Sequence, residues 1–203
     1  MENYIIVNGR QIELTEKQIR EIIDAYEEKQ RLLSTVQVGE TVKIGDREFI
    51  VLGQYEDETA LIAKDILGKI AFGNNNNFDG SAVDAWCESL AEDLANSVGE
   101  QNIVEHTVDL TSDDGLKDYG AVHRKVSLLT TEQYRQYVDI LDKHKPNSWW
   151  WLATPYSTPR HDDDSWVKCV APSGCINYGG YYYGFGVRPF LILKSSIFGS
   201  SEE

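Results

Sequence analysis

Hydrophobic positions near the N-terminus first form two short strand-like runs and then recur every three or four residues. The runs at 4–7 and 10–14 flank an Asn-Gly dipeptide at position 8, which suits the tight turn of a β-hairpin. Thr15, with Gln18 three positions later, has the spacing of a capping box, and apolar side chains follow at helical spacing as far as Leu33. The pattern predicts a β-hairpin and a helix over residues 1–35. The apolar stripe of this helix could pack on the rest of the chain or mediate homo-oligomer formation.

From position 36 the pattern changes to short strands separated by turns and to two further helices. Helical spacing begins after Ser81, with Trp86 in the middle of the apolar stripe, and again after Thr130 or Thr131. Turn residues recur through the last third of the chain, which predicts short strands joined by long loops. We expect residues 36–203 to form one α+β domain. Strand-like runs occupy residues 40–44, 48–52, 59–63, 107–110 and 125–129.

Residues 148–193 combine two apolar borders with a polar and aromatic interior. The segment opens with Trp149, Trp150 and Trp151 and closes with the apolar run 187–193, and both borders have the composition of a protein core. Tyrosine, aspartate, serine and glycine dominate the interior. Tyrosine provides a large contact area at low entropic cost, and serine and glycine allow adaptable hydrogen bonding. This division predicts a rigid scaffold that displays a recognition surface.

Four tyrosines lie close together near the end of this interior, namely Tyr178, Tyr181, Tyr182 and Tyr183. Glycines are interspersed among them, and burying all four rings would require a hydrogen-bond partner for each hydroxyl group. We therefore expect exposed rings, gathered with Trp166 and the acidic run 162–164 on one face, because exposed aromatic clusters mark interfaces. The residues that we expect to contact a ligand are Tyr156, Arg160, His161, Asp162, Asp163, Asp164, Trp166, Lys168, Asn177, Tyr178, Tyr181, Tyr182, Tyr183 and Phe185.

Charge and composition exclude several classes of function. A net charge of −14 and a pI near 4.7 argue against a nucleic-acid partner, which requires a basic footprint. No apolar run approaches the roughly 18 residues of a membrane span, so we expect no membrane insertion. The N-terminus lacks the pattern of a secretory signal, and three cysteines do not form a disulfide framework. We expect a protein that is made in the cytoplasm without a signal peptide.

Three groups of side chains could support chemistry. The consecutive carboxylates at 162–164 could bind Ca²⁺, but they lack the spacing of a calcium loop, so we favour a solvated acidic loop and expect no metal site. Only Lys168 stands beside Cys169 and Cys175 to lower a thiol pKa, which favours two unpaired thiols. His161 could act as a base, but the chain contains no nucleophile elbow, phosphate loop or HExxH motif. We therefore expect neither catalysis nor a cofactor.

Several segments, in their order along the chain, resemble a bacterial and phage family with a C-type-lectin-type fold. The resemblance covers residues 36–193 and implies an α+β fold of short strands, two helices and long loops, preceded here by the N-terminal β-hairpin and helix. Arg188 would then anchor the final strand through hydrogen bonds to loop carbonyls. The fold is distantly shared with formylglycine-generating enzymes. The matching segments are Val38–Leu52, Ser81–Leu94, Val126–Tyr134, Trp150–Pro155 ("WWLATP") and Gly186–Phe190 ("GVRPF").

Some members of this family are variable proteins of diversity-generating retroelements, in which adenines of a C-terminal coding segment are rewritten. An Asn codon changed only at its adenines cannot become Glu, Gln, Met, Lys or Trp. Between Tyr156 and Phe185 only Trp166 and Lys168 fall outside the reachable set. The resemblance implies a variable region at about 149–193 that binds a protein or glycan on a cell surface, in a phage-encoded, virion-associated (tail) setting.

Two alternatives remain at this point. The first is a copper-dependent oxidase of the formylglycine-generating type that uses Cys169 and Cys175. The second is a non-diversified structural module of the same fold.

Overall fold

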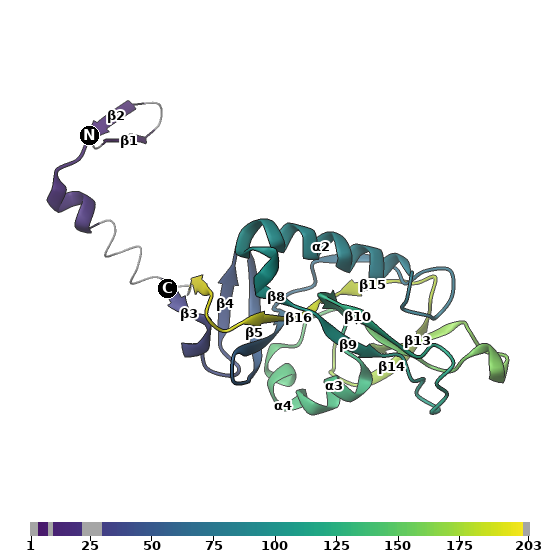
Figure 1. Cartoon of the computed structure of the whole chain (residues 1–203). Coiled ribbons are helices and arrows are strands. Elements are labelled where there is room, and N and C mark those ends of the chain that lie inside the picture. The colour runs from purple at the N-terminus through teal and green to yellow at the C-terminus, as the bar shows by residue number, and fades with distance from the viewer. Residues whose placement is uncertain (1–3, 8–9, 22–29, 201–203) are drawn as a thin grey trace.

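The computed structural model describes residues 4–7, 10–21 and 30–200 (Figure 1). These residues form an α+β body that consists mostly of sheet, including a large sheet curled into a half-barrel, together with a separately paired hairpin. The α+β prediction is therefore confirmed. No helix in the described part of the chain is long and apolar enough to cross a membrane.

The N-terminal hairpin and the start of its helix form as predicted. The Thr15 amide donates to Gln18 Oε1 at 3.0 Å and the Gln18 amide donates to Thr15 Oγ1 at 3.3 Å, so the reciprocal capping box precedes a helical turn at 16–21. The predicted continuation at 22–29 lies outside the described residues. The two antiparallel hairpin strands are β1 (Tyr4–Val7) and β2 (Arg10–Glu13).

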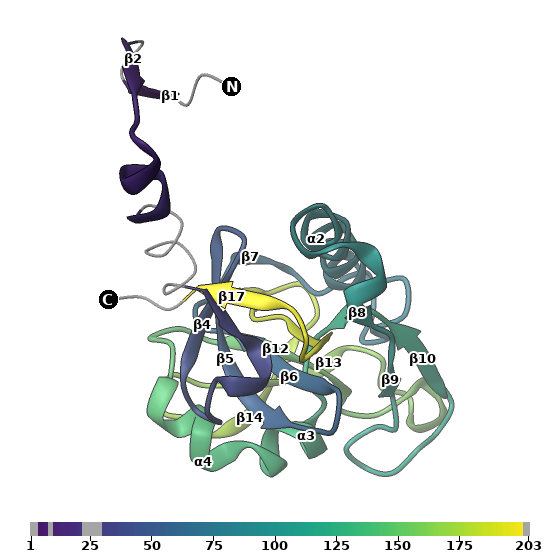
Figure 2. The same ribbon diagram turned by 60° about the vertical axis from the view of Figure 1, so that its left-hand side comes forward.

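The prediction that this helix reaches Leu33 is wrong. Leu33 begins the short 3-10 turn η1 (Leu33–Thr35), directly after strand β3 (Gln30–Leu32). Its amide donates to the Ile197 carbonyl at 2.8 Å, and its side chain is fully buried in the main core. Pairing of β3 with β17 (Phe198–Ser200), seen in Figure 2, thus overrides the local helical pattern.

The large sheet brings the two ends of the main body together. Its further strands are β4 (Thr41–Ile44), β5 (Arg47–Gln54), β6 (Glu58–Ala63), β8 (Ile103–Val104), β11 (Val126–Ser127) and β16 (Phe190–Lys194). The strand order is β11-β16-β6-β5-β4-β17-β3, and β8 also pairs with β16. The three strands predicted between positions 40 and 63 are confirmed as β4, β5 and β6.

A second sheet carries the segment that sequence analysis singled out. Its strands are β7 (Gly68–Ala71), β12 (Trp150–Pro155), β13 (Trp166–Val170), β14 (Ile176–Gly180) and β15 (Gly184–Val187). The order is β14-β13-β12-β15-β7, so β14 is an edge strand. A separate antiparallel ribbon consists of β9 (His106–Asp109) and β10 (Ala121–Arg124).

Helices cover the body from two sides, with α2 on one side and α3 and α4 on the other (Figure 1). The Ser81 side chain caps α2 (Ala82–Val98) by accepting the Asp84 amide hydrogen at 3.0 Å. Thr130, and not Thr131, is the N-cap of α3 and forms a complete capping box with Gln133. The remaining helical turns are α3 (Thr131–Gln136), α4 (Val138–Leu141), η2 (Glu100–Asn102), η3 (Asp142–His144) and η4 (Pro159–His161).

Alternation along β12 divides the tryptophans between two cores. Trp151 packs in the larger core with Cys87, Val167 and Cys169, whereas Trp150 faces the smaller core around Tyr134. Trp149 points to the same side as Trp151 and packs against the larger core. The border that was predicted to be core is therefore core on both faces of the sheet.

Arg188 is fully buried, and it forms the hydrogen bonds to carbonyl groups that we predicted, at the ends of β6 and η3. Its Nε donates to the Ala63 carbonyl at 2.9 Å, and its Nη2 donates to the carbonyls of Lys64 at 3.2 Å and His144 at 3.1 Å. The guanidinium carbon lies 5.2 Å from the centroid of the Trp150 ring. Burial lowers the pKa of Arg188 to about 10, so the charge remains present at neutral pH.

Candidate functional site

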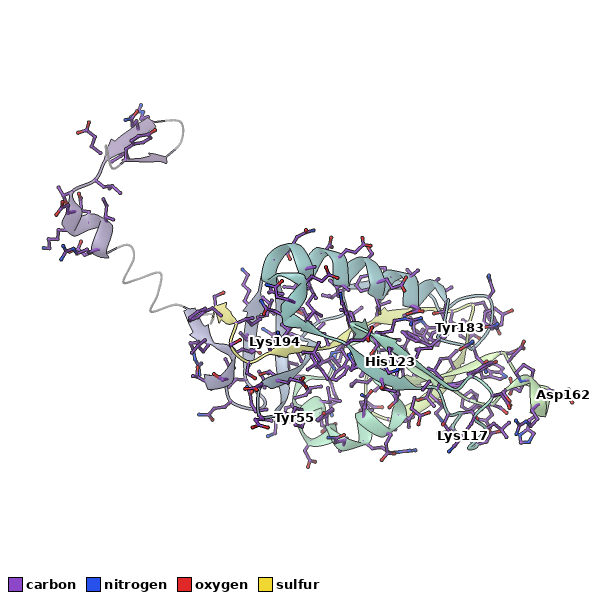
Figure 3. All side chains as sticks on the ribbon, in the orientation of Figure 1. Tyr55, Lys117, His123, Asp162, Tyr183 and Lys194 are labelled. Carbon is purple, nitrogen blue, oxygen red and sulfur yellow. The ribbon has the colours of Figure 1, made fainter. Side chains whose placement is uncertain are left out.

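The interior of the 148–193 segment lies at one end of the body. Figure 3 shows Asp162 and Tyr183 at this end and Tyr55 and Lys194 toward the other. Three of the clustered tyrosines are exposed, with Tyr178 at 50%, Tyr182 at 57% and Tyr183 at 44% of their full accessible area. The expectation that some of these rings reach solvent is therefore confirmed.

A first aromatic group consists of Tyr156, Trp166 and Tyr178. The Tyr156 and Tyr178 ring centroids lie 5.1 Å apart, and Trp166 meets Tyr178 edge-on at 5.6 Å. Lys168 pairs with Tyr178 across β13 and β14, and its ammonium lies 5.7 Å from the Tyr156 ring centroid. Because side chains two apart on a strand share a face, Trp166, Lys168 and Tyr178 all lie on one face of this sheet.

A second aromatic group consists of Tyr181, Tyr182, Tyr183 and Phe185. Consecutive ring centroids lie 5.5, 4.8 and 5.5 Å apart along this series. Phe185 also stacks on Trp149 at 5.6 Å and lies 4.5 Å from Trp151, and both Phe185 and Tyr181 are half-buried against the larger core. These two predicted ligand contacts therefore support the surface more than they form it.

Two glycines of β14 provide the floor beneath the second group. A Cβ atom on Gly179 would lie 2.5 Å from Phe185 Cε2, and one on Gly180 would lie 2.6 Å from Tyr182 Cζ. Neighbouring residues of a strand point to opposite faces, so the two rings lie on opposite sides of β14. Tyr178 and Gly180 point to the same face of β14, so the exposed rings of Tyr178 and Tyr182 lie on one side of this strand, as expected. Phe185 and an edge of the Tyr183 ring contact Gly179 on the other side.

An acidic loop, residues 112–118, holds every basic residue that we expected to contact a ligand. Lys168 Nζ lies 3.0 Å from an Asp113 carboxylate oxygen, and Lys168 is only 8% exposed. His161 Nδ1 lies 2.9 Å from Asp114 Oδ2, and Arg160 forms an ion pair with the Asp118 carboxylate. The prediction that Lys168 belongs to the ligand surface is therefore wrong, because its charge is committed to Asp113 beneath the first aromatic group.

Asp114 is the centre of this loop's hydrogen bonding. The Ser112 and Ser157 hydroxyl groups both donate to its carboxylate, in addition to the His161 contact. Burial acts to raise the pKa of Asp114, but these hydrogen bonds outweigh it and hold the pKa well below its usual range. Asp118 accepts the Thr158 hydroxyl hydrogen at 2.6 Å. The loop thus fixes the chain where it leaves β12.

The acidic run 162–164 forms the exposed tip of the site. Asp162 has a left-handed backbone with φ of 56°, which aspartate tolerates better than most residues. The Asp163 carboxylate accepts the Ser165 amide hydrogen at 3.0 Å, and the Asp164 carbonyl accepts the Asn76 amide hydrogen at 2.9 Å. Within the described ranges, no group of three His, Cys, Asp or Glu side chains is placed to hold a metal ion.

Asn76 is an anchor of the site that sequence analysis missed. Its side chain is fully buried and donates to the carbonyls of Ser157 at 3.0 Å and Trp166 at 3.1 Å. The Tyr119 hydroxyl donates to its amide oxygen at 2.7 Å. It stands among four consecutive asparagines, so the sequence contains no signal that selects this one. Asn177, which was predicted to contact ligand, is exposed and accepts the Tyr178 amide hydrogen.

The two cysteines of the site have different environments and both are free. Cys169 is fully buried in the larger core, and burial raises the pKa of its thiol to about 12 although Lys168 acts to lower it. Cys175 is exposed in the turn before β14. This placement gives no specific support to the oxidase alternative.

Comparisons with known proteins identify a family but no function. No curated protein and no solved structure gives a significant match to the chain. The model of a family described as a domain of unknown function, DUF6273, matches residues 56–195. This range runs from the start of β6 to the end of β16 and includes all of the residues predicted to contact a ligand. Because the match covers more than half of the chain, the protein belongs to the DUF6273 family.

Proposed function

We propose that this protein is a non-catalytic ligand-binding display protein with a C-type-lectin-type fold. Its variable region would present an aromatic and acidic surface that captures a protein or glycan on a cell surface, in a phage-encoded setting. The observation that carries the proposal is the exposure of Tyr178, Tyr182 and Tyr183 on a fixed backbone. Soluble proteins seldom expose several neighbouring aromatic rings without a binding role.

The arrangement of the elements supports the C-type-lectin-type assignment. The segments that resemble the family occupy β4 and β5, the capped helix α2, the β11–α3 unit, β12, and the β15–β16 connection, in that order. The motif residues Trp150, Trp151 and Arg188 are buried and tie the two sheets together. A fold of short strands and long loops held by these residues suits the display of a variable segment.

Rigidity beneath the tyrosines supports a binding role. Phe185 is clamped by Trp149 and Trp151, and the glycine floor leaves Tyr182 and Phe185 little room to move inward. A surface that is already ordered loses little conformational entropy when it binds, so more of the contact energy appears as affinity.

The DNA around the coding sequence gives the most direct test of diversification. We expect a reverse-transcriptase gene and a near-copy of the 3′ coding segment that differs only at adenines. Codons for Trp149, Trp150, Val187 and Arg188 should be unchanged in that copy, because these side chains form the scaffold. A locus that lacks both features would contradict the diversification. The codons that should align with adenine-bearing codons are those of Tyr156, Arg160, His161, Asp162, Asp163, Asp164, Cys169, Cys175, Tyr178, Tyr182 and Tyr183.

Truncation of a central tyrosine tests the surface itself. With fluorescently labelled protein on intact bacterial cells as the probe, Tyr182→Ala should weaken binding by about 2 kcal/mol, roughly 30-fold, if the ring is a hot spot. Thermal stability should change little, because the side chain is 57% exposed. Phe198→Ala is a matched control, since Phe198 is also 57% exposed but lies on β17, away from the site. Equal binding by wild type and Tyr182→Ala would argue against this surface.

A further inference from the structure

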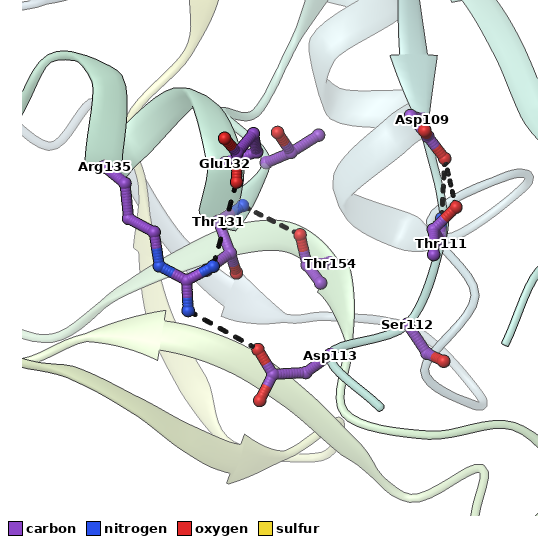
Figure 4. A pocket seen from close by; sticks show the side chains of 9 residues that line it. Asp109, Thr111, Ser112, Asp113, Thr131, Glu132, Arg135 and Thr154 are labelled. Carbon is purple, nitrogen blue, oxygen red and sulfur yellow. Dashed lines mark hydrogen bonds and ion pairs between the residues drawn. The ribbon is translucent and has the colours of Figure 1, made fainter. Parts of the chain in front are cut away.

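A separate polar cavity of about 190 Å³ lies beside the acidic loop, outside the 156–185 interval. Its walls are the end of β9 with the loop that follows it, the first turn of α3, and Thr154 near the end of β12 (Figure 4). Five of the nine lining side chains carry a hydroxyl group, three carry a carboxylate and one is an arginine. The cavity is smaller than the roughly 300–1,000 Å³ of sites that enclose a drug-sized molecule, so its size suits a single small unit.

The Thr131 hydroxyl is the feature that marks this cavity as a site. Thr131 is only 3% exposed, and its Oγ1 has no hydrogen-bond partner among the described residues. Figure 4 shows this oxygen directed into the space between Arg135, Thr154 and Asp113. The Thr154 hydroxyl accepts the Thr131 amide hydrogen at 2.8 Å, which fixes the first turn of α3 against β12. A buried hydroxyl without a partner is costly unless a ligand satisfies it.

Arg135 closes the cavity with a donor that is only loosely held. The Arg135 side chain is 59% exposed. Its guanidinium lies 3.9 Å from a Glu132 carboxylate oxygen and 4.0 Å from an Asp113 oxygen, and both distances are longer than hydrogen bonds. Together with Asp109, these groups place charges of both signs around a small space. A free cation would meet Arg135 and a free anion would meet three carboxylates. A neutral ligand with several hydroxyl groups can donate to the carboxylates and accept from Arg135 and Thr131 at once.

A second cavity, of about 270 Å³, adjoins the first through a shared wall residue, Asp113. Tyr156 lines this second cavity together with His161 and Asp163 of the exposed loop. The Tyr156 ring offers an aromatic contact, which no residue lining the first cavity can provide, and an aromatic ring can pack against the C–H face of a sugar ring.

We propose that the cavity around Thr131 and Arg135 binds one neutral sugar residue, and that a connected sugar residue extends past Asp113 toward Tyr156. The binding site is distinct from the exposed rings of Tyr182 and Tyr183. It does not require that those rings bind a ligand or that the segment is diversified.

The test uses the full-length ¹⁵N-labelled protein and four probes, glucose, galactose, mannose and N-acetylglucosamine, at millimolar concentrations. We expect at least one sugar to give saturation-transfer signals and to shift the amide resonances of residues 109–113 and 130–135. Thr131→Val and Arg135→Met should each weaken this binding about fivefold or more, because each removes a hydrogen bond to the ligand. Thr41→Val, a matched change on β4, and Tyr182→Ala should leave it unchanged. Arg135 is exposed, so its variant remains informative if Thr131→Val does not fold.

Several outcomes would overturn the proposal. One is the absence of a response to all four sugars, and another is a response whose amide shifts lie elsewhere. Sugar binding that Thr131→Val and Arg135→Met both leave intact would do the same. Shifts of the same amides by methylammonium or acetate, without any by the sugars, would mean that the cavity takes an ion. By contrast, Tyr182→Ala protein that no longer binds cells but still binds the sugar would support the proposal, because it would show that the cavity and the aromatic surface are separate sites.

Discussion

Replacing Arg188 by methionine should lower the free energy of unfolding by about 3 kcal/mol. Methionine keeps much of the side-chain volume, but it removes the guanidinium donor from the carbonyls of Ala63, Lys64 and His144. Loss of a hydrogen bond at a buried group costs about 1–3 kcal/mol, and the bond to Ala63 is fully buried whereas the other two are partly buried. Relief from burying a cation, whose cost is visible in the lowered pKa of Arg188, offsets part of this loss.

Urea unfolding of matched variants measures this effect. Arg188→Lys should fall between wild type and Arg188→Met, because an ammonium group keeps the charge but cannot reach three carbonyls with a planar fork. Arg135→Met is the control, since its ion pairs are long and exposed and should contribute less than about 0.5 kcal/mol. Similar unfolding midpoints for Arg188→Met and Arg135→Met would show that Arg188 does not anchor the closing strand.

The folded state should lose about 3 kcal/mol of stability as the pH falls from 6.5 to about 4, because of His106. The imidazole is buried edge-on against the Phe190 ring, with a centroid separation of 5.0 Å, and its Nε2 lies 2.8 Å from the Ser127 hydroxyl. Burial lowers the pKa of His106 to about 4, against 6.5 for a free imidazole.

The direction follows from proton binding in the two states. Between pH 6.5 and 4 the unfolded chain binds a proton at His106 that the folded chain excludes, so acid favours unfolding throughout this window. Above pH 6.5 both states are neutral and the slope vanishes. Carboxylates with lowered pKa values, such as Asp114 and Asp109, add to this loss only below about pH 5, where the unfolded chain begins to protonate them.

Unfolding free energies measured at pH 7, 6, 5 and 4.5 in wild type and His106→Gln test this expectation. The glutamine variant should have a lower free energy of unfolding than wild type at pH 7, and this free energy should change little down to pH 5. His123→Gln is the control, because His123 is exposed on β10 and the wild-type slope should persist. If the free energy of unfolding of His106→Gln falls with pH as steeply as that of wild type, a group other than His106 causes the acid sensitivity.

Local signals in the sequence were sufficient for much of the architecture. The reciprocal bonds of Thr15 with Gln18 and of Thr130 with Gln133, and the Ser81 cap of α2, involve residues only three positions apart. The short apolar runs bounded by turn residues between positions 40 and 63 likewise report on neighbours within one segment. Such patterns depend on backbone geometry that is the same in any fold, so they could be predicted without knowing the partners.

Pairings between distant segments could not be predicted in this way. Leu33 leaves the helical pattern because β17, some 165 residues later, is available to pair with β3. The acidic loop meets Lys168 only after folding, and nothing within either segment selects the partner. Asn76 is distinguished from its asparagine neighbours by carbonyls of Ser157 and Trp166.

In the candidate site, too, some features follow from local sequence and others depend on contacts between distant segments. Sequence by itself determined that tyrosines spaced by glycines would be exposed, because four phenol groups cannot all find buried partners cheaply. Only the tertiary structure decided that Phe185 faces the core, that Lys168 forms an ion pair with Asp113, and that Tyr182 and Phe185 lie on opposite sides of β14. It also decided that the Thr131 hydroxyl would be buried at a cavity wall, because that depends on how α3, β12 and the loop after β9 meet. The exposure of the tyrosine rings follows from the local composition of the segment, whereas the partner of each side chain depends on how distant segments pack together.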